Sequence, residues 1–550
     1  MDYKWNNPPI AKTSFEIYKC LAKERHFSRE TMKNFINNNI EYHDASLFKS
    51  SKAICDKINK AVKDNKKIAV FADYDCDGVC SCYILYMALK YINADVIYKL
   101  PNRMKDGYGI KEKSVLELND LGVDLIITTD NGIAAVDAVD KALELGMDII
   151  ITDHHLPKDK LPNCLIMDAH VKDSGYPFNG LCGAGVAFKL ASLLIKDFKN
   201  CYIYSELVTA AAIATIADQM LLIDENRKIV KEGLMNINSP LCSIGILKLI
   251  ELFGLNRYKV NSGNIGFAIA PCINAAGRLD TPEYALKLLL SDCDSDAKYY
   301  GEKIFNLNEK RKEIQKNISD NLIVDDNTEC IMIAMKENIT GIAGILASRI
   351  KEKYLKPTFI FHDDGENLGG SARTFGEFPI IDCLNGNKDL ILEGGGHAAA
   401  CGVKLKKENL KKFNDRCDEI FKKWKQENPD KLLQELKATC KIDFTLINDK
   451  LVNNINKLEP FGNGNEEPIF ICENIEVVES KIIGKLKNTV KLKLKNNNIE
   501  LDAIGFQSFK EKYCEAYSPK NINLMFNIKL NEFPKGTFKI QLNCIDFKIG

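Results

Sequence analysis

Three short runs of apolar, mostly β-branched residues near the start of the chain are each followed within two residues by an aspartate. The runs are residues 68–71, 125–128 and 149–152, with helical patterns at 79–91 and 134–145 between them. Continuous apolar runs of this length are typical of buried parallel strands. Strands that alternate with helices predict an α/β layer built on a mostly parallel sheet.

Acidic residues and two histidines follow these predicted strands. Because ligands bind in the crevice beyond the carboxyl ends of parallel strands, we expect the side chains to meet at one sheet edge. Concentrated negative charge is costly unless cations neutralise it, and oxygen ligands with one or two histidines favour Mn²⁺ or Mg²⁺. The residues are Asp73, Asp75, Asp77, Asp130, Asp153, His154 and His155.

Three other interpretations use residues from the same region. Residues 73–78 also match the opening of an EF-hand loop, but Ile84 stands where the bidentate glutamate belongs, and a strand precedes the loop. A single strand-end aspartate could instead cap the next helix, although coincidental capping is a poor explanation for three strand ends and an Asp-His-His triplet. Cys76, Cys80 and Cys82 lack the second Cys or His pair of a zinc site.

The motifs around these residues resemble those of the DHH phosphoesterases, and more narrowly the RecJ exonucleases. The DHH family is named after a triplet like Asp153-His154-His155, and residues 73–78 and 128–133 are similar to the first and second RecJ motifs. Asp218, after the Ala-rich helical run 208–217, resembles a further motif. Residues 101–109 and 273–278 look like RecJ elements that contain Arg103, Asn274 and Arg278.

The resemblance continues in the same order along the chain. Residues 341–349, 370–373 and 394–402 are similar to the accessory DHHA1 domain, and residues 459–468 to the entrance of the RecJ OB domain. One departure is Ala372, where related phosphoesterases often carry glycine. Alanine costs little there unless the position needs a positive φ.

The resemblance implies phosphodiester hydrolysis with two metal ions. Two ions about 3.5–4 Å apart can hold a phosphate, lower the pKa of a bridging water and stabilise the leaving oxygen. One ion would bind Asp73, Asp75 and Asp130. The other would bind Asp77, Asp130, His154 and Asp218. Asp153 would orient a histidine, and His155 would contact the scissile phosphate or protonate the leaving group. The implied catalytic residues are Asp75, Asp77, Asp130, His154 and His155.

The resemblance also implies a phosphate-binding wall in the second domain. Guanidinium groups chelate phosphate oxygens in a planar fork, and glycines let a backbone approach a ligand closely. In isolation, an arginine more often forms a surface ion pair, and the triplet 394–396 would be a turn. The candidates in this wall are Arg349, Ser371, Arg373 and His397, and those for the pocket that grips the 5′ end are Arg103, Asn274 and Arg278.

The C-terminal region supplies a local basic signal. Lysine and arginine equal aspartate and glutamate at 75 each, so nucleic-acid contact must come from local patches. Alternating strands at 490–495, 500–506, 522–530 and 538–546 predict a small barrel. Residues 480–499 hold six lysines and no acid, and Lys487, Lys491 and Lys493 are the predicted DNA contacts. A solubilising outer face or an edge-strand guard explains the lysines equally well.

We predict five regions from these patterns. Residues 1–45 form an N-terminal segment and residues 46–225 the DHH domain. Residues 226–328 form a helical linker, in which 297–322 is one long helix with Ile304, Leu307, Ile314, Ile318 and Leu322 along one face. Residues 329–441 form a smaller α/β DHHA1 domain, with strands at 330–334 and 358–361, a helix at 342–353 and an amphipathic segment at 409–436. Residues 442–550 form an OB-like barrel.

We therefore expect a single-stranded-DNA-specific exonuclease that degrades from 5′ to 3′ to mononucleotides in DNA repair and recombination. Nineteen scattered cysteines, with no secretory or membrane-spanning pattern, predict a location in the reducing cytoplasm with no membrane contact. We also expect a monomer. The resemblance implies a single-strand-binding protein and a helicase as partners. Small-substrate DHH enzymes would lack the barrel and long linker, and a non-catalytic DHH scaffold would lack ligands that this chain retains.

Overall fold

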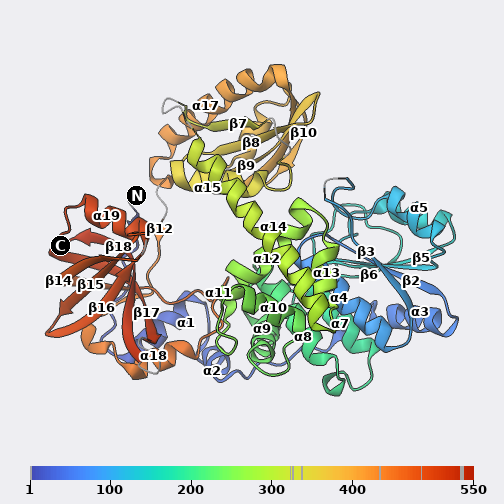
Figure 1. Cartoon of the computed structure of the whole chain (residues 1–550), viewed down its shortest axis with the longest axis horizontal. Helices are drawn as coiled ribbons and strands as arrows, with labels where there is room; N and C mark the ends of the chain where they lie inside the picture. The colour runs from blue at the N-terminus through green and yellow to red at the C-terminus, as the bar shows by residue number, and fades with distance from the viewer. Residues whose placement is uncertain are drawn as a thin grey trace. The chain divides into compact units, whose positions relative to one another are not determined.

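The computed structural model of the chain describes residues 3–103, 105–322, 324, 328–335, 339–432, 435–484, 486–532 and 538–550. The chain divides into two units. One unit comprises residues 41–432, and the other joins residues 1–40 to residues 433–550. In Figure 1 the second unit therefore contains both ends of the colour range, blue and red.

The first domain of the larger unit is built on a five-stranded parallel sheet (Figure 1). The strands, in spatial order, are β3 (Asp95–Lys99), β2 (Lys67–Ala72), β4 (Leu125–Thr129), β5 (Asp148–Thr152) and β6 (Leu165–Met167). The three strands predicted from the apolar runs are confirmed as β2, β4 and β5. The chain order reverses between β2 and β4, and this reversal is the place where ligands bind in open parallel sheets.

Helices cover both faces of this sheet, because side chains along a strand alternate between the faces. Ile68 and Val70 of β2 share a core with α4 (Cys76–Tyr91), α7 (Gly183–Leu194) and α8 (Tyr204–Ala217). Ala69 and Phe71 share another core with α5 (Glu112–Asp120) and α6 (Val136–Glu144). Helix α3 (Ser51–Lys63) also packs in the first core. Helix α4 begins three residues before its predicted start.

A mainly helical region follows, as the sequence predicts. Its helices are α9 (Asp224–Ile237), α10 (Ile244–Leu252), α11 (Ser262–Asn264), α12 (Ala270–Leu279), α13 (Glu283–Leu289) and α14 (Asp294–Asn321). Between α11 and α12, residues Ile265–Ile269 form a π-helical turn that ends two residues before Pro271, which lacks a backbone N–H. Helix α14 confirms the long helix predicted at 297–322. Its Ile304 joins the core of the first domain, and Ile314 and Ile318 pack in the core around α15 (Ala343–Tyr354).

The second domain of the larger unit has a five-stranded mixed sheet. The strand order is β10 (Ile391–Gly396), β11 (Ala400–Lys406), β9 (Asn367–Arg373), β8 (Thr358–Asp363) and β7 (Ile331–Met335), and only the pair β7–β8 is parallel. The glycine triplet 394–396 lies in β10 rather than in a turn. The short helix α16 (Ile381–Asn385) and α17 (Leu410–Glu427) complete the domain. The prediction of one amphipathic segment through residue 436 is wrong, because Pro429 disfavours helical backbone at Asn428, where α17 ends.

The smaller unit contains a closed barrel, as predicted. Strand β14 (Phe470–Ile483) pairs with β15 (Thr489–Asn496), and the order continues through β16 (Ile499–Gly505), β18 (Phe538–Ile549) and β17 (Asn521–Glu532) back to β14. Closure removes the exposed edges of the sheet. Helix α19 (Gln507–Glu515) connects β16 to β17, and β13 (Cys440–Lys441) extends the sheet beside β14.

The N-terminal segment packs with this barrel, which the sequence did not predict. Ile17 and Leu21 of α1 (Ser14–Glu24), together with Phe35 of α2 (Arg29–Asn37), share a core with barrel residues and with α18 (Asp449–Asn456). Strand β1 (Lys4–Trp5) pairs with β12 (Glu435–Leu436). Helices in the described part of the chain are all too short or too polar to cross a membrane.

Candidate active site

The acidic residues predicted to bind metal meet at the sheet edge. Asp73, Asp75 and Asp77 follow β2, while Asp130 and His154 follow the neighbouring strands β4 and β5. His154 lies at the centre: its Nε2 atom is 3.0 Å from Asp130 Oδ1 and 3.6 Å from Asp77 Oδ2. Asp218 follows the end of α8, and its Oδ2 atom lies 3.8 Å from the same nitrogen.

These side chains form two groups. Ligand atoms of Asp73, Asp75 and Asp130 lie within 4.8 Å of one another, and so do those of Asp77, His154 and Asp218. Asp130 connects the groups through its contact with His154. All six residues predicted as metal ligands are therefore brought together. Ligand atoms of Asp130, His154 and His155 also lie within 4.8 Å of one another, so this third group overlaps the other two. Which carboxylate binds which ion stays a prediction.

Backbone contacts hold two of the carboxylates in place. Asp75 Oδ1 accepts hydrogen bonds from the backbone N–H groups of Asp77 (3.0 Å) and Gly78 (3.1 Å), and so caps α4. The carboxylate of Asp77 accepts the N–H groups of Gly183 (2.7 Å) and Ala184 (2.8 Å) at the start of α7. Helix capping and clustering therefore coexist, because a carboxylate has about four acceptor positions.

Close backbone approach explains two glycines around the cluster. A Cβ atom on Gly183 would lie 2.5 Å from Asp130 Cβ, and one on Gly78 would lie 2.4 Å from the carbonyl oxygen of Asp73. Asp130 itself has a φ of 60°, in the left-handed region that few residues other than glycine adopt. The site thus depends on small residues that the metal-ligand motif alone does not explain.

Electrostatics indicate that the cluster needs positive charge. Burial and the neighbouring Asp75 raise the pKa of Asp73 to about 8, and burial and Asp77 raise the pKa of Asp218 to about 7. Burial and Asp77 also raise the pKa of Asp130 well above its usual value. Among the described residues, none donates a hydrogen bond to the buried Oδ1 atom of Asp73. Crowded oxygen ligands with one imidazole and an unsatisfied carboxylate oxygen fit hard divalent cations such as Mn²⁺ and Mg²⁺.

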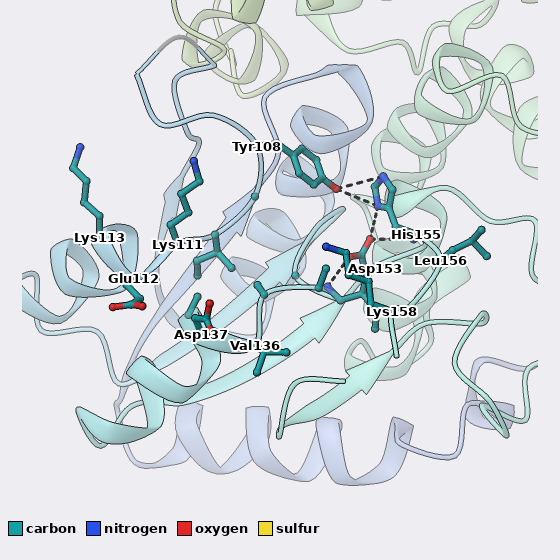
Figure 2. Close-up of a pocket in the computed structure, with 17 residues that line it drawn as sticks. Tyr108, Lys111, Glu112, Lys113, Val136, Asp137, Asp153, His155, Leu156 and Lys158 are labelled. Atoms are coloured by element: carbon teal, nitrogen blue, oxygen red, sulfur yellow. Dashed lines mark hydrogen bonds and ion pairs between the residues drawn. The ribbon is translucent and has the colours of Figure 1, made fainter. Parts of the chain in front are cut away.

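Asp153 orients His155 rather than joining the cluster (Figure 2). Its Oδ1 atom lies 2.7 Å from His155 Nδ1 and accepts the N–H of His154, and its Oδ2 atom accepts the N–H of Ile133 at 2.9 Å. Burial opposes ionisation of Asp153, yet the hydrogen bonds from His155 and from backbone N–H groups keep its pKa below the usual value. Burial alone would lower the pKa of His155, but the bond to Asp153 raises it to about 9.

Residues predicted for the 5′-end pocket lie beside the first motif. The Asn274 side chain accepts the N–H of Cys76 at 2.9 Å, so it supports the loop that carries Asp75 and Asp77. The Arg278 guanidinium donates to the carbonyl of Gly341 at 3.0 Å. Burial and the charge of Arg103 lower the pKa of Arg278 to about 10, so the two guanidinium groups lie close enough to interact. Arg103 also stacks 5.0 Å above the Tyr74 ring.

Residues predicted for the phosphate-binding wall are not joined to the cluster. Ser371 and Arg373 lie on β9, and the Arg373 guanidinium occupies the space where Gly344 lacks a side chain. Arg349 on α15 and His397 after β10 are exposed. Within the described residues, no hydrogen bond or ion pair links these four side chains to the metal ligands. Their role in phosphate binding stays a prediction.

The lysine face of the barrel is balanced by acids on the next strand. Lys491 Nζ lies 3.0 Å from Asp502 Oδ2, and Lys493 Nζ lies 2.8 Å from Glu500 Oε2. These acids follow residues 480–499 in the sequence and lie on β16, which pairs with β15. Lys491 and Lys493 are therefore paired with acids, which favours the solubilising interpretation, and their predicted contact with DNA stays a prediction. Lys487 lies in the turn before β15.

Comparison with known proteins places these features in a family. Family models match the DHH family N-terminal domain at residues 67–215, the DHHA1 domain at 327–423 and the RecJ OB domain at 439–546. A protein of Haemophilus influenzae named single-stranded-DNA-specific exonuclease RecJ is 30% identical over 538 residues, which cover 93% of this chain and 92% of that protein. The chain belongs to the RecJ family.

Other RecJ proteins agree with this assignment. The protein of the same name from Bacillus subtilis is 32% identical over 528 residues, and the match spans 94% of this chain but only 66% of that relative. The crystal structure of Thermus thermophilus RecJ in complex with Mn²⁺ superposes with a TM-score of 0.82 at 25% identity, and the match covers this whole chain and 80% of that one. The family resemblance and the predicted fold class are thus confirmed.

Two residues of this RecJ-family site were missing from the predicted set. The Tyr108 hydroxyl lies 3.3 Å from His155 Nδ1, although the motif around it was recognised. Asp168 follows β6 and is buried, and its pKa is raised to about 7 mainly by burial. Residues 165–168 repeat the pattern of an apolar strand followed by aspartate. The pattern was overlooked because β6 has only three residues.

Proposed function

We propose that this RecJ-family enzyme degrades single-stranded DNA from the 5′ end to 5′-mononucleotides, with Mn²⁺ or Mg²⁺ as cofactor. The observation that carries the proposal is the cluster of six predicted metal ligands, which includes His154 at its centre, with one buried Asp73 oxygen that accepts no hydrogen bond from the described residues. The names of its relatives support the substrate, and the Mn²⁺ complex of Thermus thermophilus RecJ supports the metal. The 5′ polarity rests on the family resemblance.

Each residue of the cluster has a proposed part in holding the ions. Asp73, Asp75 and Asp130 would hold one ion, and Asp77, Asp130, His154 and Asp218 the other. When bound, two divalent ions polarise the phosphate and lower the pKa of water for attack. The N–H groups at the start of α7 keep the Asp77 carboxylate oriented, and the α4 cap does the same for Asp75.

His155 is proposed to donate a proton or a hydrogen bond to the reacting phosphodiester. With its pKa raised to about 9, this side chain is protonated at neutral pH. Asp153 engages Nδ1, so Nε2 is the nitrogen that can face a substrate oxygen. A proton delivered to the leaving 3′-oxygen would assist the departure of the terminal nucleotide.

Arg103 and Arg278 are proposed to bind the 5′-terminal phosphate. Their guanidinium groups flank the loop that carries the first motif, on the side of the sheet covered by α4 and α12. Two neighbouring cations disfavour each other unless an anion lies between them, and a phosphate meets that need. Asn274 would act by positioning the loop, while Arg349, Ser371, Arg373 and His397 would contact the phosphate from the second domain.

We also propose the cellular setting that the sequence indicates. The enzyme would act as a monomer in the cytoplasm, in DNA repair and recombination, with a single-strand-binding protein and a helicase as partners. All nineteen cysteines are free thiols, which suits a reducing compartment.

End-labelled oligonucleotides test the proposed activity. Two copies of one single-stranded DNA carry a label at either the 5′ or the 3′ end, and each is digested with Mn²⁺ or Mg²⁺. We expect early release of the 5′ label as mononucleotide while the 3′ label remains on long fragments. Early release of the 3′ label would contradict the polarity. If neither DNA is degraded while pyrophosphate or short oligonucleotides are hydrolysed, the small-substrate interpretation is the correct one.

A further inference from the structure

A cavity of about 660 Å³ lies on the outer side of His155 (Figure 2). It is open to solvent, and it is bordered by the loop that contains Tyr108, by the first turns of α5 and α6, and by the segment after β5 that contains Leu156 and Lys158. Asp153 and His155 form its inner wall. The cavity therefore borders the active site at His155.

The lining of the cavity is mostly apolar. Ile110, Ile133 and Ala134 line it together with Leu156, which is 75% exposed. Lys111, Lys113 and Lys158 supply positive charge, and Figure 2 shows Lys111 and Lys113 with extended side chains. The amino-terminal ends of α5 and α6 also border it, and neither end has a side-chain cap. Apolar walls with a few polar groups are typical of sites that bind a small organic ring system.

Acidic residues around the cavity reduce the attraction of its lysines for a phosphate. Glu112 and Asp137 offset part of the lysine charge, and Asp106 holds Lys113 at 3.4 Å. A phosphate alone would thus gain little. A nucleobase has apolar faces that the hydrophobic lining can cover, so the base should supply most of the binding.

The cavity and Arg278 lie toward opposite faces of the parallel sheet. Helices α5 and α6 cover one face of the sheet, whereas α4, which packs against α12 and Arg278, covers the other. A strand bound by its 5′-phosphate near Arg103 and Arg278 would cross the sheet edge at the metal ligands. Its next nucleotide would then reach the cavity beyond His155.

We propose that this cavity holds the base of the nucleotide on the 3′ side of the scissile phosphate. The proposal rests on the proposed exonuclease function, and it adds a binding subsite for the part of the strand that the enzyme retains. The volume lies in the range of about 300–1,000 Å³ that small-molecule sites occupy, which is sufficient for one nucleotide.

Abasic substrates with a cavity-filling variant test this subsite. Each oligonucleotide carries one tetrahydrofuran abasic unit, at the first, second or third position from the 5′ end. For the unaltered enzyme we expect the abasic unit at the second position to lower kcat/KM roughly tenfold, the order of effect of losing one stacked base. Ala134→Trp, at an exposed position that lines the cavity, should lower kcat/KM on normal DNA to a similar extent.

The decisive experiment combines Ala134→Trp with the DNA that is abasic at the second position. If the tryptophan occupies the base site, Ala134→Trp loses little further activity on the second-position abasic DNA. Ala53→Trp, at an exposed position on α3 outside the cavity, is the matched control and should keep the full abasic effect. Equal sensitivity of Ala134→Trp and Ala53→Trp, or no effect of the second-position abasic unit, overturns the subsite. Absence of DNA hydrolysis by the unaltered enzyme instead overturns the proposed function.

Discussion

The acidic cluster of the parallel sheet and the lysine face of the barrel are both groups of like charge in the sequence, yet their charges are balanced differently. In the cluster, buried carboxylates face one another, and the pKa of Asp73 is raised to about 8. On the barrel, Lys491 and Lys493 each lie within 3.0 Å of a carboxylate from the adjacent strand. Like charges at the end of several strands thus predict a ligand, whereas like charges along one strand do not.

The physical reason is burial. An exposed lysine is screened by water and finds a cross-strand partner at little cost. A buried carboxylate has neither option, so a group of them is stable only with cations or bound protons. The following experiments test this difference.

The largest expected effect comes from removing one charge of the cluster. Asp75→Asn keeps an oxygen that can cap α4 but removes a metal ligand charge, so we expect kcat/KM on single-stranded DNA to fall by roughly a thousandfold or more. His154→Ala should lose activity to a similar extent. Circular dichroism should show an intact fold. Asp443→Asn changes a helix cap in the smaller unit and is the control, with activity near that of the unaltered enzyme. Retention of a near-normal rate by Asp75→Asn would show that the metal site is misassigned.

Asp153→Asn tests the orientation of His155 with a smaller expected loss. The amide cannot stabilise a protonated histidine as a carboxylate does, so the pKa of His155 should fall from about 9. We expect kcat to decrease by roughly 10–100-fold with little change in KM, as is usual when a residue behind a catalytic group is removed. The pH profile should shift its basic limb toward lower pH. An unchanged profile would assign Asp153 a purely structural role, because Asp153 also accepts the N–H of Ile133.

Sequence reasoning found this site because its residues follow strands. Parallel strands that end in Asp73, Asp130 and Asp153 must place those residues at one edge, so the motif order determines the geometry. Sequence reasoning missed Asp168 because a three-residue strand leaves too short an apolar run to recognise.

Pairings between distant segments were beyond prediction. The acids that neutralise Lys491 and Lys493 lie on another strand, and only the register of β15 with β16 reveals them. The packing of α1 and α2 against the barrel joins segments more than 400 residues apart, for which no local pattern exists. Similarly, the end of α17 depended on Pro429 rather than on the amphipathic pattern, which continued past it.

Stability of the metal-free enzyme should decrease as pH rises. The pKa values of Asp73 (about 8) and Asp218 (about 7) lie above those of an unfolded chain, so the folded state binds more protons between about pH 4 and pH 8. Stability is then lost as pH rises through this window, and the raised pKa of His155 acts in the same direction up to about pH 9. In EDTA we expect Tm at pH 8 to be lower than at pH 5.5 by on the order of 5 °C.

Two further measurements isolate the cluster as the cause. Mn²⁺ should raise Tm more at pH 8 than at pH 5.5, because protons compete with the ion for the carboxylates. Combined Asp73→Asn and Asp218→Asn substitution should weaken the pH dependence in EDTA. A Tm in EDTA that is equal or higher at pH 8 would contradict the account of uncompensated carboxylates.

The smallest effect is expected on the barrel. Lys491→Gln with Lys493→Gln removes charges that Asp502 and Glu500 already balance, so affinity for single-stranded DNA should fall by less than about threefold. The matched change, Glu500→Gln with Asp502→Asn, leaves both lysines without their acids and should tighten binding and steepen its salt dependence. Binding is measured by fluorescence anisotropy across a salt series with the inactive Asp75→Asn enzyme. A large loss from the lysine pair would show that DNA phosphates displace the acids, and the lysine face would then be a DNA-binding surface as the sequence first predicted.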